Sequence, residues 1–126
     1  MLRIRARGTA RNNNAGVAVT WELLVGAVVV ASNAVDTGNY GANNVVRGWN
    51  LEADLICTTN GASGVFEADG RVEMQTGAAA AATWQLTNTG NVVDLTTARD
   101  VAIRFTWGAA NANNTITKRA MTVELL

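Results

Sequence analysis

Five carboxylates gather in two short, similar segments of the sequence. LEADL spans residues 51 to 55, and GVFEADGRVE spans residues 64 to 73. Their acids are Glu52, Asp54, Glu67, Asp69 and Glu73. Clustered carboxylates of this kind can hold a divalent cation or act as the general acid and base of a hydrolase. The residues between the acids decide between these uses and a plain solvent-exposed surface.

Both segments alternate charged and apolar residues, which is the pattern of β-strands with one solvated face. A hairpin that turns near Gly61 or Ala62 puts all the acids on that face, with Arg71 opposite Glu52 or Asp54 in an ordinary cross-strand ion pair. A glycosidase needs two carboxyl groups about 5 to 10 Å apart in a cleft, one with a raised pKa. EADG also lacks the spacing of a calcium loop. We interpret the acids as the outer face of a sheet, with a binding patch or a catalytic or metal site as the alternatives.

The rest of the sequence offers few reactive side chains. It has no histidine, which removes the commonest general base and the usual zinc ligand. Its one cysteine, Cys57, excludes an internal disulfide. No base is visible beside this thiol, so we expect Cys57 to be a buried small hydrophobe. We assign no catalytic, cofactor-binding or metal-binding residue, and we expect a protein without a cofactor that is not an enzyme.

Composition narrows the range of partners. The chain has 126 residues and a mass of 13.2 kDa, which fits a single domain spanning residues 1–126. Ten basic and ten acidic residues cancel, so net charge does not attract the chain to nucleic acid or to an anionic membrane. No apolar run reaches the roughly 18 residues of a membrane helix, and no signal peptide is recognised. We therefore expect neither nucleic acid nor a membrane among its partners.

Apolar residues recur with a period of two along most of the chain, which predicts about eight strands separated by turns rich in Gly, Asn and Thr. One polar face per strand predicts an all-β, antiparallel β-sandwich. We expect it to be jelly-roll-like rather than immunoglobulin-like, because the Cys–Trp–Cys pattern is missing. The four tryptophans fall on the apolar sides, and the last strand carries Met121, Val123 and Leu125 inward. Gly26 is expected to form a bulge or bend in one long strand, and the alanines at 77–83 leave a short helix as an alternative.

Loops and arginines supply the candidate contact residues. If each strand reverses direction, the loops at 11–16, 59–64, 88–91 and 108–114 share one asparagine-rich end, and the long loop at 32–44 lies at the other. The candidates for contacts with a partner are Arg3, Arg5, Arg7, Arg11, Asn12, Asn13, Asn14, Tyr40, Asn111, Asn113 and Asn114. An alternative for the arginines is a charged edge strand that prevents sheet-to-sheet aggregation.

Two segments resemble a known family. GWNLEADLICTTNGASGVFEADGRVEMQT (48–76) contains a strand led by Trp49, a TxxGxxG turn and an A-x-G strand. FTWGAANANNTIT (105–117) ends in WG-x-A-x-x-x-N-T-I-T. Together they resemble a small jelly-roll module of tailed-bacteriophage virion structural proteins, and the likeness covers most of the chain from LRIRARGT onward. The resemblance implies a virion component without catalysis, assembled as a homotrimer.

The leading hypothesis is therefore a capsid-decorating (cement) subunit, assembled into the virion in the host cytoplasm. It would stabilise the particle by binding its own copies and the major capsid protein or other virion proteins. The alternative is the receptor- or glycan-binding tip of a head or tail fibre. That hypothesis needs exposed aromatics or a groove at a loop end, and Tyr40 is the only obvious aromatic in a loop. A carboxylate-dependent hydrolase is the third hypothesis.

Overall fold

The computed structural model of the protein describes residues 1–13, 16–34, 39–41 and 43–126, which form ten β-strands and no helix. The strands are β1 (Leu2–Asn12), β2 (Val17–Val25), β3 (Val28–Ser32), β4 (Asn39–Tyr40), β5 (Asn43–Thr59), β6 (Gly64–Gln75), β7 (Ala81–Asn88), β8 (Val92–Val93), β9 (Val101–Trp107) and β10 (Thr115–Leu125). Eight of them have five residues or more, while β4 and β8 have two each. The prediction of an all-β chain with about eight strands is confirmed, and the residues of the alternative helix at 77–83 lead into β7.

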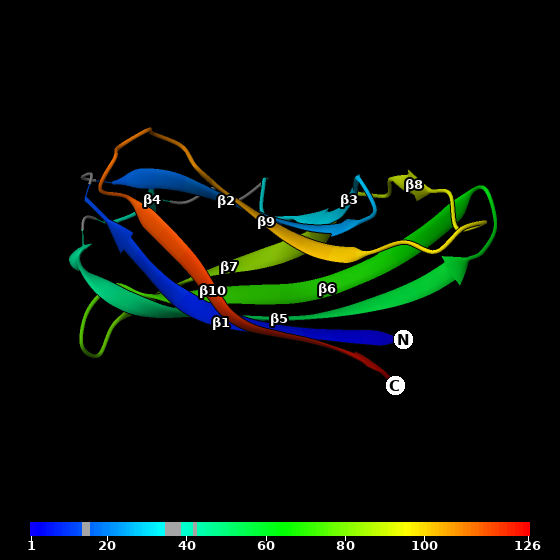
Figure 1. Ribbon diagram of the computed structural model, residues 1–126, viewed down its shortest axis with the longest axis horizontal. Helices are drawn as coiled ribbons and strands as arrows, with labels where there is room; N and C mark the ends of the chain where they lie inside the picture. The colour runs from blue at the N-terminus through cyan, green and yellow to red at the C-terminus, as the bar shows by residue number, and fades with distance from the viewer. Residues whose placement is uncertain (14–15, 35–38, 42) are drawn as a thin grey trace.

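The strands form two facing layers that are joined on one side (Figure 1). The first layer runs in the order β10, β1, β5, β6, β7, and the second runs β3, β2, β9. β7 and β3 join the layers through the pairs Ala31↔Asn88 and Ser32↔Thr87. On the other side, β10 and β9 are free edges, and no ladder joins them within the described residues. The molecule is therefore a nearly closed antiparallel sandwich, as the sequence predicts.

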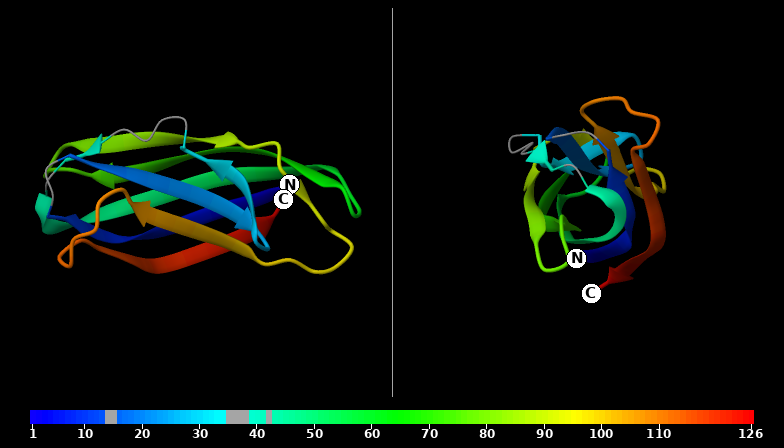
Figure 2. Two further views of the ribbon diagram at one scale, coloured as in Figure 1. Left: turned by 90° about the horizontal axis from the view of Figure 1, so that it is seen from above. Right: turned by 90° about the vertical axis from the view of Figure 1, so that its left-hand side faces the viewer.

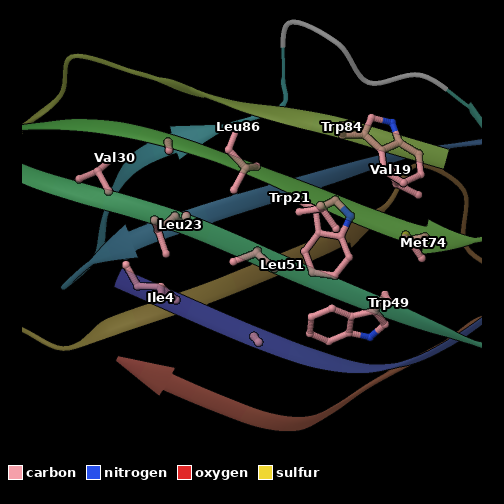
Figure 3. Packing of buried hydrophobic residues seen from close by; sticks show 14 of the residues in the cluster. Ile4, Val19, Trp21, Leu23, Val30, Trp49, Leu51, Met74, Trp84 and Leu86 are labelled. Atoms are coloured by element: carbon pink, nitrogen blue, oxygen red, sulfur yellow. The ribbon is translucent and has the colours of Figure 1, made fainter. Parts of the chain in front are cut away.

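Apolar side chains from both layers fill the space between them (Figure 3). Trp21, Trp49 and Trp84 are buried, while Trp107 on the edge strand β9 is half-buried. The ring centroid of Trp21 lies 4.9 Å from that of Trp49 and 4.7 Å from that of Phe105. Aromatic rings at these separations gain contact energy beyond the area that they bury. The prediction that the tryptophans face the core is confirmed.

Gly26 forms a hairpin turn, and the predicted bulge at this position is wrong. Its φ of 62° lies in the left-handed region that glycine enters without strain. The chain reverses there, so that Val25 pairs with Val28 and β2 and β3 become separate strands. A glycine between two apolar runs is compatible with either a bulge or a tight turn, so alternation alone does not separate them.

This extra reversal also changes which loops share an end of the molecule. Asn12 at the end of β1 lies beside Asn43 at the start of β5, and Tyr40 pairs with Val17. The residues around Tyr40 therefore share an end with the loops at 76–80 and 108–114, while the turn at 60–63 and the segment 89–100 lie at the other end (Figure 2). The predicted grouping is wrong for the residues around Tyr40 and for the loops at 59–64 and 88–91, because it counted β2 and β3 as one strand. The 108–114 loop lies beside the end of β1, as predicted.

Candidate partner-binding surfaces

The five carboxylates lie on the outer face of the first layer, as predicted. β5 and β6 form a hairpin that turns at Gly61, whose φ is 92°. Glu52, Glu67, Asp69 and Glu73 are exposed, and Asp54 is half-buried. Across the described part of the chain, no three acidic or cysteine side chains are grouped so that they could hold a metal ion. This hairpin face is a charged sheet surface.

The arginines of β1 face two of these acids. Arg3 donates from Nε to Asp54 Oδ1 at 2.9 Å and from Nη2 to Asp54 Oδ2 at 3.0 Å. This bidentate bond lowers the pKa of the Asp54 carboxyl below its ordinary value. Arg5 donates from Nη2 and Nε to Glu52 Oε1 at 3.2 and 3.3 Å. Because β1 lies between β10 and β5, the alternative of an edge strand protected by arginines is wrong.

Two other guanidinium groups on this face have no salt-bridge partner in the described part of the chain. Arg71 lies opposite Glu52 as the sequence predicts, but Glu52 accepts its bonds from Arg5. Neither Arg71 nor Arg7 takes part in a salt bridge within the described residues. Sequence reasoning missed Arg71 as a candidate contact residue because it assigned this side chain to a structural ion pair. The sequence offered one signal for Arg71: both Arg5 and Arg71 lie opposite the single carboxylate of Glu52, on the strands to either side of it.

Arg7 and Arg71 line a hollow of about 480 Å³ on the outer face, which we call the outer hollow. Its other lining residues include Glu73 of β6 and Ala120 and Thr122 of β10. The small side chain of Ala120 lies opposite Arg7 in the ladder, so it leaves room beside that guanidinium. The outer hollow thus presents two unpaired cations from strands far apart in the sequence.

Most of the remaining candidates come together at one end of the molecule. Arg11 Nε donates to the Asn113 carbonyl at 3.0 Å, and the Asn13 N–H donates to Asn114 Oδ1 at 2.8 Å. The Asn113 N–H donates in turn to Asn111 Oδ1 at 2.9 Å. These bonds join the 108–114 loop to the end of β1. Asn14 lies outside the described residues.

Asn12 and Tyr40 are fully buried, so the prediction that they contact a partner is wrong. Asn12 Nδ2 donates to the Tyr40 carbonyl at 2.8 Å and to the Gly41 carbonyl at 3.2 Å. Tyr40 Oη donates to the Gln75 carbonyl at 2.7 Å, and its ring centroid lies 6.2 Å from that of Trp84. Both side chains find main-chain partners inside the molecule, which lets them be buried without a large desolvation cost.

No aromatic side chain is exposed, although the structure describes all seven of them. The receptor-binding alternative required exposed aromatics or a groove at a loop end, and the buried Tyr40 does not supply the exposed aromatic. Cys57, in contrast, is exposed, so its predicted burial is wrong. The register of β5 against β6 shifts between Cys57 and Thr59, which ends the inward series at this point, and the thiol donates to the Thr59 carbonyl at 3.2 Å.

The two free edges leave apolar side chains partly uncovered. On β10, Met121 is half-buried, Val123 is 44% exposed and Leu125 is 82% exposed. Val123 pairs with Ile4, which is fully buried, so it belongs to the inward series as predicted. Its exposure reflects the missing neighbour beyond β10. The inward residues of β9 from Val101 to Trp107 are likewise only half-buried.

Comparison with protein-family models, with curated proteins and with solved structures finds no match for this chain. Within the described residues there is no helix that is both long enough and apolar enough to cross a membrane.

Proposed function

We propose that this protein is a non-enzymatic structural subunit that binds acidic surfaces of other proteins, as a capsid-decorating subunit of a phage virion does. The observation that carries the proposal is the outer hollow, with unpaired Arg7 and Arg71 around the small Ala120. A guanidinium group binds a carboxylate through two parallel hydrogen bonds, so the hollow suits an Asp or Glu side chain of a partner. Such recognition requires no reacting group.

The placement in a virion rests on the resemblance of residues 48–76 and 105–117 to phage jelly-roll modules. A subunit that binds only the assembled shell stabilises that shell by mass action, in proportion to the logarithm of its concentration over its dissociation constant. In this function the partners are the major capsid protein or other virion proteins together with further copies of this chain. The resemblance implies a three-fold assembly, and a measurement of the mass in solution distinguishes it from a two-fold one.

A binding assay on capsids purified from the phage that encodes the chain tests the proposal. We expect the native protein to co-sediment with capsids, and less so as salt is raised, because exposed charge pairs are screened. Replacing Arg7 and Arg71 together with alanine should raise the dissociation constant at least about tenfold, since bonds to charged groups contribute roughly 1.5 to 3 kcal/mol each.

The matched control is Arg99→Ala, which removes one arginine whose partner is Asp94 and which lies outside the outer hollow. This variant should bind capsids as the native protein does. Native protein that fails to co-sediment at low salt would contradict the capsid-decorating function. Equal binding by the native protein and the Arg7/Arg71 variant would contradict the role of the outer hollow.

A further inference from the structure

We propose that the free edge of β10 pairs antiparallel with β10 of a second copy of this chain, about a two-fold axis at Thr122. The pairing goes beyond the capsid-decorating function and does not depend on it. It follows from three properties of β10: its unpaired main-chain groups, its uncovered apolar side chains and the order of its charges.

The main-chain groups are the first property. The Leu126 N–H donates to the Met1 carbonyl at 2.9 Å, and Leu125 pairs with Leu2. In an antiparallel ladder, hydrogen-bonded and non-hydrogen-bonded pairs alternate. The N–H and C=O groups of Met121, Val123 and Leu125 therefore point away from β1, toward the free edge. An unpaired row of this kind is a template for another strand.

The apolar side chains are the second property. Val123 and Leu125 stand in the inward series and yet are 44% and 82% exposed. A strand that pairs with the free edge of β10 would cover the side chains of Val123 and Leu125. With Thr122 on the axis, Met121 of each copy lies opposite Val123 of the other, so apolar side chains meet on the inward face.

The charges are the third property, and they identify the occupant as a second copy. β10 carries Arg119 near its middle and Glu124 near its end, and neither forms a salt bridge within the described residues. Gly8 pairs with Lys118 and Arg7 with Ala120, so Arg119 is the extra residue of a bulge in β10, next to Ala120. Antiparallel pairing about Thr122 sets Ala120 opposite Glu124 of the other copy, with Arg119 beside it.

The same bulge limits how far the pairing extends. Natural sheets protect their edges with bulges and charged side chains. Lys118 and Arg119 protect the first half of β10 in this way, while residues 121–125 carry no bulge and only one charge. The unprotected half is thus the half whose apolar side chains are exposed, and it is the half that pairs.

Sedimentation velocity over a concentration series tests the proposal on the whole chain. We expect a mass of twice 13.2 kDa at the higher concentrations. Glu124→Arg should raise the dimer dissociation constant at least about tenfold, because it places two positive charges together at both ends of the pair. The double variant Arg119→Glu with Glu124→Arg restores opposite charges and should recover dimerisation. Glu67→Arg, a charge reversal at an exposed position of β6 outside the outer hollow and away from β10, is the matched control.

A covalent probe gives a second readout. Thr122 on the axis forms a non-hydrogen-bonded pair with itself, whose Cα atoms are about 4.5 Å apart, within the range of a disulfide. Thr122→Cys in a Cys57→Ser background should therefore form a covalent dimer under mild oxidation, while Thr117→Cys in the same background should not. A monomer at all concentrations, a mass of three chains, or a charge-swapped double variant that stays monomeric would overturn the pairing. Capsid binding is measured separately, so the failure of one proposal leaves the other standing.

Discussion

Replacing Gly8 with alanine should destabilise the protein more than any ordinary surface substitution. Gly8 lies in β1 at the register shift against β10, where it also pairs with Trp49 of β5. An added Cβ would lie 1.8 Å from the Thr117 carbonyl oxygen and 2.8 Å from two carbon atoms of the Trp49 ring. The oxygen belongs to the main chain of β10, so relief requires that the strand move by more than an ångström, as judged from ordinary contact distances of about 3.5 Å.

The cost combines two effects. Overpacking a well-filled site costs about 1 to 3 kcal/mol, and each ladder hydrogen bond of β10 that is weakened costs about 1 kcal/mol. We expect a loss of about 3 kcal/mol or more, a large share of the 5 to 15 kcal/mol that is typical of a domain. For a chain of this length, this corresponds to a melting temperature lower by about 10 °C.

Urea unfolding followed by tryptophan fluorescence measures this loss directly. Gly77→Ala is the control, because its nearest neighbour would be the Ala80 Cβ at an ordinary 3.7 Å. We expect that variant to lie within about 0.5 kcal/mol of the native protein. If Gly8→Ala unfolds at the same urea concentration as Gly77→Ala, the close packing of β10 and Trp49 on β1 is refuted.

Two further predictions concern single side chains. The side chain of Asn33 is buried. Its Oδ1 accepts a hydrogen bond from the main-chain N–H of Trp21 at 2.6 Å, and its Nδ2 donates to the main-chain carbonyl of Val19 at 3.1 Å. Asn33→Ala should therefore cost about 2 to 3 kcal/mol in urea unfolding, because main-chain groups of β2 lose their partner; a loss below about 0.5 kcal/mol would refute this role. Arg3 lowers the pKa of Asp54 below its ordinary 3.8, so their bond stabilises the fold above that pH and the gain is lost as the pH falls through the lowered value. The difference in melting temperature between the native protein and Asp54→Asn should thus shrink from about pH 5 to about pH 2, and a constant difference would contradict the assignment.

The outer face was predictable because its determinants are local. The alternation in β5 and β6 and the short turn at Gly61 set which residues face solvent and place Arg71 opposite Glu52. Which arginine bonds Glu52 was not predictable in the same way. Glu52 has a cation on each neighbouring strand, and only the side-chain geometry shows that it bonds Arg5.

The alternation of apolar and polar residues could not predict features that depend on strands far away in the sequence. The alternation in β10 shows that Val123 and Leu125 face inward, but burial depends on whether another strand lies beyond them. The burial of Tyr40 has the same cause, since Gln75 and Trp84, which hold it, are more than thirty residues away. The reversal at Gly26 had the widest effect, because one missed turn exchanged the ends assigned to the residues around Tyr40 and to the loops at 59–64 and 88–91.

The position of β1 has a consequence for how the chain folds. β1 pairs with β5 and β10, which begin at residues 43 and 115, so it has no partner nearby in the sequence. During synthesis at about 5 to 20 residues per second, one side of β1 stays unpaired for roughly 5 to 25 s, until β10 has been made. Closing so long a loop is the slow kind of folding step that distant β-pairings impose. We therefore expect the docking of β10 onto β1 to limit the rate of folding, with the edge of β1 that β10 pairs with exposed to chaperones until then.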